Sequence, residues 1–258
     1  MEDIRHHGRR TAYRVSDRGG DGPPILAVHG SGSNHGVWRA QHRLADEWPF
    51  VAVDLSGHGD SEDIDTPPGP ETLEAYVEDV VAVARETNAG VLCGNSLGGA
   101  VVLQLALEAD LDPAALLLVG TGAKLGVRSD LLGWLGSDFD RAIEFLLGPN
   151  RLLAGGDDRY LSAAEESMRS AGQAVTERDF RTSHAFDVRD RLGEIRTPGL
   201  AVTGEHDELT PPAYHEYLAE ELPAGEWTTI SNAAHLSMLE RPAAFNDAVR
   251  SFLSETGV

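Results

Sequence analysis

The stretch Gly94-Asn95-Ser96-Leu97-Gly98-Gly99 decides the fold prediction, because it stands between a short apolar run at residues 91–93 and an apolar segment at residues 100–109. It contains the only G-x-S-x-G pattern in the chain. Such glycines permit a turn too tight for a β-carbon, which leaves the serine strained, with its hydroxyl exposed at a helix N-terminus that favours negative charge. The pattern predicts a strand, a turn and a helix, with Ser96 as a nucleophile. The alternative is a glycine-rich turn whose serine caps the helix.

Short apolar runs and helix-like segments alternate outward from this turn in both directions. Runs typical of buried strands lie at residues 25–28, 50–53, 91–93, 115–119, 199–202 and 227–230. Apolar residues at helical spacing lie between 37 and 48, after the proline-rich residues 67–70, at 100–109, after Pro211-Pro212, and towards the end at 245–252. This alternation predicts parallel strands joined by helices that cover both faces of a sheet. The expected fold class is therefore α/β, with a mainly parallel sheet.

The rhythm changes between Ala123 and Asp187, where no strand-like apolar run is found. Helix-like pieces occur instead, at residues 140–147 and 163–170. We expect a helical insertion at residues 123–187, with residues 1–122 and 188–258 forming the α/β core.

A serine nucleophile needs a base and an acid that orients the base, and in this fold class they follow in the order serine, acid, histidine. Asp207 comes just after the run at 199–202, and His235 just after the run at 227–230. Both therefore lie beyond the carboxyl end of a strand, the edge where open α/β sheets place their sites. We predict Asp207 as the orienting acid and His235 as the base. Glu205 and Glu208 are the rival acids.

Five motifs in order make the chain similar to the α/β-hydrolase superfamily, and more narrowly to its capped carboxylesterase and meta-cleavage-product hydrolase branch. They are the serine turn, His29-Gly30-Ser31-Gly32-Ser33, the D-x-x-G-x-G-x-S loop at 54–61, the G-x-x-D turn at 204–207, and the histidine segment at 235–242. The resemblance covers nearly the whole chain. It implies the α/β-hydrolase fold, with residues 123–187 as the helical cap that shapes the substrate pocket.

The resemblance also implies a reaction. The oxyanion hole would use the backbone N–H groups of Leu97 and Ser31, with Gly32 as the alternative second donor. We expect hydrolysis of a small carboxylic ester through an acyl-enzyme. Hydrolysis of a C–C bond and opening of a lactone are alternatives, since related enzymes share these residues, and a non-enzymatic ligand receptor of the same fold is a more distant one. Dehalogenases and epoxide hydrolases of this fold place aspartate where Ser96 stands, which argues against their chemistry.

The charge of the chain is unusual, because 42 acidic and 21 basic residues leave a formal net charge of −21. Nucleic-acid binding needs clustered Lys and Arg, so this class of partner is not expected. One explanation of the charge is adaptation to high salt, where screening makes acidic self-repulsion tolerable. A GC-rich genome would explain why Lys124 is the only lysine, but not the excess of acids. We therefore expect a halophilic protein.

No cofactor is indicated by the remaining patterns. The glycines near residue 30 do not match the dinucleotide fingerprint, no P-loop is present, and the single cysteine, Cys93, permits neither an intramolecular disulfide nor a Cys-based zinc site. No apolar stretch approaches the roughly 20 residues that cross a bilayer, and the first residues contain no apolar segment of the 7–15 residues found in export signals, so none is expected. We expect a cytoplasmic enzyme with a small-molecule substrate, no metal and no membrane partner. The oligomeric state is not indicated.

Overall fold

The computed structural model describes residues 1–155 and 158–258. Within these residues the chain forms an eight-stranded sheet in the order β1-β2-β4-β3-β5-β6-β7-β8. The six strands from β3 to β8 pair in parallel, whereas β1 and β2 pair antiparallel with each other, and β2 with β4. The strands are β1 (Glu2–His6), β2 (Arg9–Ser16), β3 (Ile25–Val28), β4 (Phe50–Val53), β5 (Val91–Asn95), β6 (Ala115–Val119), β7 (Gly199–Gly204) and β8 (Gly225–Ile230).

The predicted α/β fold with a mainly parallel sheet is confirmed, and all six apolar runs are strands. The two antiparallel strands β1 and β2 were not predicted. Most of β1 is exposed, and in β2 the arginines Arg9, Arg10 and Arg14 interrupt the apolar residues, so no apolar run marks either strand. They extend one edge of the sheet, where one face needs little apolar cover.

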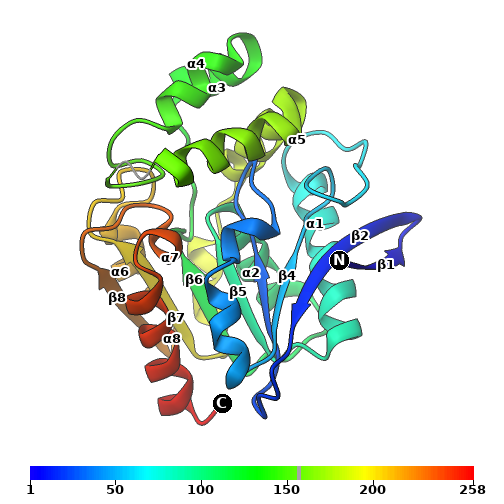
Figure 1. Ribbon diagram of the computed structural model, residues 1–258, viewed down its shortest axis with the longest axis vertical. Coiled ribbons are helices and arrows are strands. Elements are labelled where there is room, and N and C mark those ends of the chain that lie inside the picture. Colours follow the sequence, from blue (N-terminus) through cyan, green and yellow to red (C-terminus); the bar gives the residue numbers. More distant parts are fainter. Residues whose placement is uncertain (156–157) are drawn as a thin grey trace.

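Helices cover both faces of the sheet (Figure 1). On one face lie α1 (Pro70–Thr87), α2 (Leu97–Glu108) and α6 (Pro212–Glu221), which pack on apolar residues such as Leu26, Val51 and Leu116. On the other face lies α8 (Pro242–Thr256), preceded by the short helix α7 (Ser237–Glu240). The apolar spacing between 37 and 48 does not form one α-helix: it forms two short 3-10 helices, η1 (His35–Trp38) and η2 (Gln41–Asp46), which bury Trp38. A third, η3 (Arg189–Glu194), precedes β7.

Three further helices stand between β6 and β7, at the carboxyl edge of the parallel strands (Figure 1). They are α3 (Ser129–Ser137), α4 (Phe139–Leu146) and α5 (Asp158–Ala185), the last of which is kinked where Gly172 adopts φ 84°. The pieces at 140–147 and 163–170 fall on α4 and α5; α3 was not predicted. The ends of the segment meet, because Lys124 and Asp187 form an antiparallel bridge and the N–H of Val188 donates to Ala123 O over 2.8 Å.

Candidate active site

Ser96 stands on the turn between β5 and α2 with φ 55° and ψ −117°, a conformation that costs free energy in a residue with a β-carbon. Two glycines make the turn possible. A β-carbon on Gly94 would lie 2.2 Å from the carbonyl oxygen of Gly98, and one on Gly98 would lie 2.4 Å from that of Val28. The turn is further held by Thr121, whose hydroxyl donates to Ser96 O over 2.9 Å. The strained serine at a helix start, expected from the glycine pattern, is present.

His235 and Asp207 are in contact, although they lie on different loops. His235 follows β8 and Asp207 follows β7, and because these strands are parallel neighbours their carboxyl ends bring the side chains together. Nδ1 of His235 lies 2.9 Å from Oδ2 of Asp207, and both side chains are buried. Burial alone would raise the pKa of Asp207, but the charge and hydrogen bond of His235 and the bonds from Thr210 lower it overall. The carboxylate therefore remains ionised at neutral pH.

Thr210 completes the surroundings of this carboxylate and was missed in the sequence. Its hydroxyl donates to Oδ2 of Asp207 over 2.7 Å, and the backbone N–H groups of Leu209 and Thr210 donate to Oδ1 over 2.8 and 2.9 Å. An Asp that accepts from N–H groups two and three residues further on is a common turn, so the D-x-x-T spacing is a signal that could have indicated it. These bonds hold the Asp207 carboxylate in one orientation.

The rival acids accept hydrogen bonds from other residues, although Glu208 also lines the cavity that contains His235. Glu205 accepts a hydrogen bond from the N–H of Asn232 over 3.0 Å, and Glu208 lies at 3.5 Å from the side-chain amide of Asn150. Among the hydrogen bonds and ion pairs of the described residues, none joins either glutamate to His235. Of the three acids near the end of β7, the one beside the histidine is Asp207.

The turn after β3 passes directly beside Ser96. A β-carbon on Gly30 would lie 3.0 Å from Cβ of Ser96. Leu97 is the first residue of α2, where N–H groups have no acceptor one turn earlier in the helix. In the part of the chain that the structure describes, no hydrogen bond uses the N–H of Leu97 or of Ser31. The N–H of Gly32, the alternative donor, is already used: it donates to Oδ2 of Asp179 over 2.9 Å.

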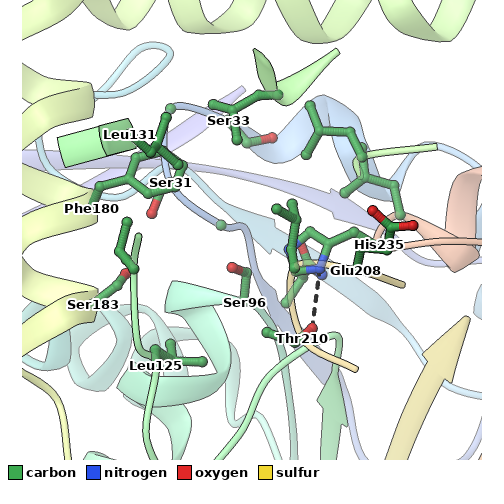
Figure 2. A pocket seen from close by; sticks show the side chains of 18 of the residues that line it. Ser31, Ser33, Ser96, Leu125, Leu131, Phe180, Ser183, Glu208, Thr210 and His235 are labelled. Carbon is green, nitrogen blue, oxygen red and sulfur yellow. Dashed lines mark hydrogen bonds between the residues drawn. The ribbon is translucent and has the colours of Figure 1, made fainter. Parts of the chain in front are cut away.

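A cavity of about 270 Å³ joins these groups. Ser31, Ser96 and His235 line it together with Thr210 (Figure 2). Most of the opposite wall comes from residues 123–187 and is apolar, with Leu125, Leu131, Phe145, Leu146, Met168 and Phe180. Such a chamber suits a small apolar group placed next to Ser96, because apolar walls contribute binding free energy and a few polar groups set the orientation.

Neither a metal-ligand cluster nor a reactive thiol is found among the described residues. Within residues 1–155 and 158–258 no group of three or more His, Cys, Asp or Glu side chains is arranged to hold a metal ion. Cys93 is buried in β5, and burial raises the pKa of its thiol well above the usual range, so it is not a reactive nucleophile at neutral pH. None of the helices described has both the length and the apolar composition of a membrane span.

A serine on a strained strand-to-helix turn, followed along the chain by an acid after one strand and a histidine after the next, is the arrangement of nucleophile-elbow hydrolases. The chain belongs to the alpha/beta hydrolase family, whose model matches residues 25–248. With esterases among both its relatives and its structural neighbours, it is grouped with the hydrolases that act on esters.

Three known proteins illustrate the similarity. Pimeloyl-[acyl-carrier protein] methyl ester esterase of Neisseria meningitidis serogroup C is 29% identical over 243 residues, which are 89% of this chain and 93% of that protein. The structure of a thermophilic esterase superposes with a TM-score of 0.85 at 28% identity, covering 99% of this chain and 98% of the other. Est816, described as an N-acyl homoserine lactone degrading enzyme, gives a TM-score of 0.84 at 27% identity, covering 97% of this chain and all (100%) of the other.

Proposed function

We propose that this protein is a serine esterase that hydrolyses a small carboxylic ester through an acyl-enzyme. The observation that carries the proposal is the arrangement of three side chains: Ser96 and His235 line one cavity, and His235 is bound through Nδ1 to Asp207 over 2.9 Å. With Nδ1 donating to the carboxylate, the free Nε2 is the nitrogen that can accept a proton. This is the tautomer that a general base requires.

In the proposed reaction, Oγ of Ser96 attacks the ester carbonyl while Nε2 of His235 takes its proton. Asp207 holds the imidazole and stabilises its charged form. The proton is then returned to the leaving alkoxide as the carbonyl–oxygen bond breaks, which leaves Ser96 acylated. Water, activated by the same histidine, attacks the acyl carbon and releases the acid, with the proton returning to Oγ.

The N–H groups of Leu97 and Ser31 are the proposed donors to the oxyanion formed in each attack. Both belong to backbone beside Ser96, and neither has another acceptor among the described residues. The removal of one such donor lowers kcat by about 10²–10³-fold in comparable enzymes. Because Gly32 donates to Asp179, it is not the second donor in this arrangement.

The apolar chamber favours an ester whose acyl group is small and apolar, with residues 123–187 acting as the cap that encloses it. A lactone is the second candidate, because Est816 shares the fold at 27% identity and a lactone is a cyclic ester cleaved by the same steps. We place the activity in the cytoplasm, without a cofactor, as the sequence leads us to expect.

Labelling with a fluorophosphonate tests the proposal. The wild-type protein should form one adduct, which peptide mass spectrometry should map to Ser96, and Ser96→Ala should not label. Ser33→Ala is the matched control, since Ser33 also lines the cavity and should not affect labelling. An adduct on Ser31, Ser33 or Ser56 contradicts the mechanism. Rates on p-nitrophenyl acetate to octanoate and on γ- and δ-lactones then separate an esterase from a lactonase.

A further inference from the structure

Asp179, on α5, is fully buried where the segment 123–187 meets the core. Its carboxylate contacts three separate parts of the chain. Oδ2 accepts from the N–H of Gly32 over 2.9 Å and lies 2.8 Å from Nε2 of His58, and Oδ1 accepts from the hydroxyl of Tyr76 over 2.6 Å. These partners belong to the turn after β3, the loop at 54–61 and α1. No step of the reaction proposed above involves the Asp179 carboxylate.

The carboxylate is paired with the imidazole of His58, which is buried as well. Burial would lower the pKa of His58, but the charge of Asp179 and the hydrogen bond to it raise this pKa overall. Burial would likewise raise the pKa of Asp179, which the same pairing and its other hydrogen bonds lower overall. A buried carboxylate and the imidazole that it contacts hold their geometry strongly, because the loss of either leaves a polar atom of the other without a partner in a medium of low dielectric constant.

The turn that Asp179 holds is the one that contains Ser31. Its ends are closed by a hydrogen bond from the N–H of Ser33 to Gly30 O over 3.1 Å. On the core side, Nδ1 of His29 donates to the same carbonyl over 2.8 Å, while its Nε2 accepts from a backbone N–H of the neighbouring loop. On the other side, a β-carbon on Gly32 would lie 3.0 Å from the Met168 side chain of α5. The turn is therefore clamped between the core and α5.

We propose that Asp179 is a positioning residue for the oxyanion hole: by binding the N–H of Gly32 it sets the orientation of the preceding peptide, which carries the N–H of Ser31. This inference rests on the proposed function, which makes Ser31 an oxyanion donor. It also links the docking of α5 to the completion of the site, since the carboxylate belongs to α5 and the donor to the core. A donor must lie 2.7–3.1 Å from the oxyanion, so a small rotation of this turn weakens the bond.

Variants at two positions test the proposal. Asp179→Ala removes the acceptor for Gly32, whereas Asp179→Asn keeps an oxygen that can accept from the same N–H. Tyr76→Phe is the matched control, because it removes another hydrogen bond of the same carboxylate without affecting the bond to Gly32. For each variant, the melting temperature, kcat and KM on p-nitrophenyl butyrate should be measured. The inhibition constant of an alkyl trifluoromethyl ketone, whose serine adduct carries an oxyanion, gives an independent measure of oxyanion binding.

We expect Asp179→Ala to lower kcat about 10- to 100-fold, which is less than the full loss of an oxyanion donor. The inhibition constant of the ketone should rise by the same factor, and KM should stay within about threefold of the wild-type value. Asp179→Asn should retain most of kcat, and Tyr76→Phe should keep kcat within about threefold even if its melting temperature falls. If Asp179→Ala does not fold, Asp179→Leu, which is close to aspartate in size and also lacks the acceptor for the N–H of Gly32, takes its place. A fall in kcat matched by a loss of ketone affinity in that variant supports the proposal, and wild-type values of both overturn it.

A folded Asp179→Ala with wild-type kcat overturns the proposal, as does a fall in kcat without any loss of ketone affinity. Failure of the proposed function is a separate result, because the wild-type protein would then neither label at Ser96 nor hydrolyse any ester. In that case there is no oxyanion for the N–H of Ser31 to bind, and Asp179 has no positioning role in catalysis.

Discussion

Oδ2 of Asp207 lies 2.9 Å from Nδ1 of His235, across the 28 positions of sequence that separate the two residues. If His235 is the proposed base, this contact selects its tautomer. Asp207→Asn should keep the fold but present an amide N–H to Nδ1, which leaves the proton on the wrong nitrogen, and kcat should fall by about 10⁴-fold as in a comparable triad. Steady-state kinetics on p-nitrophenyl butyrate measures the fall.

Glu205→Gln and Glu208→Gln are the controls for this variant, since both carboxylates belong to the same loop and neither forms a hydrogen bond or ion pair with His235 in the described structure. Because Glu208 lines the cavity, Glu205→Gln is the cleaner control of the two. Each should change kcat by less than about tenfold. If Asp207→Asn retains most of its turnover while one of the glutamates is indispensable, the assignment of the acid is wrong.

The serine turn should not tolerate a β-carbon. In Gly98→Ala the new carbon would lie 2.4 Å from a backbone oxygen of Val28, so the sheet or the turn must move. We expect a loss of about 2 kcal/mol or more in the free energy of unfolding, together with a loss of labelling at Ser96. Gly133→Ala is the control, because Gly133 lies within α3 and no atom lies within 4 Å of the position that a β-carbon would take there.

Gly133→Ala should stabilise the protein by up to about 1 kcal/mol, the difference in helix propensity between the two residues. Urea unfolding of both variants beside the wild type decides the comparison. Equal effects of the two substitutions would show that the close approach at Gly98 does not constrain the turn.

Acid should destabilise the fold before the carboxylates titrate. His215 is fully buried, and burial lowers its pKa to about 4, whereas a histidine of the unfolded chain titrates near 6.5. Between these values the unfolded state binds the extra proton, so the free energy of unfolding falls as the pH drops from about 6.5 to about 4. For one such group the loss at pH 5 is about 2 kcal/mol.

His215→Gln isolates this contribution, because glutamine can still accept the hydrogen bond that Thr121 N–H donates to Nε2. The variant should lose about 2 kcal/mol less than the wild type between pH 7 and pH 5, as measured by urea unfolding at each pH. His206→Gln, at an exposed residue, should leave the pH dependence unchanged. Identical pH dependence in His215→Gln and wild type would contradict the expectation.

Salt should stabilise the protein if its composition reflects a saline habitat. A formal net charge of −21 produces mutual repulsion that extends over a Debye length of about 30 Å at 0.01 M salt and about 3 Å at 1 M. The melting temperature should therefore rise between these concentrations, equally in NaCl and KCl if the cause is screening. A melting temperature that stays constant or falls means that the acidic composition has another origin.

The sequence by itself determined the six parallel strands and the serine turn, for local physical reasons. Apolar runs bounded by turns form strands wherever both faces of a sheet are covered, and the glycines around Ser96 are required by the van der Waals radius of a β-carbon. The same reasoning missed β1 and β2, whose polar residues do not form an apolar run. The helical spacing between residues 37 and 48 also did not show that two short 3-10 helices, η1 and η2, form there.

Tertiary structure alone decided which groups meet. Glu205, Asp207 and Glu208 follow the same strand, and only the path of the loop after β7 brings the Asp207 carboxylate into hydrogen-bond contact with His235, while the two glutamates bond to other residues. The bond between Asp179 and Gly32 joins residues 147 positions apart. It depends on how α5 packs on the core, and no local pattern of residues encodes a contact between two elements that are brought together only by the complete fold.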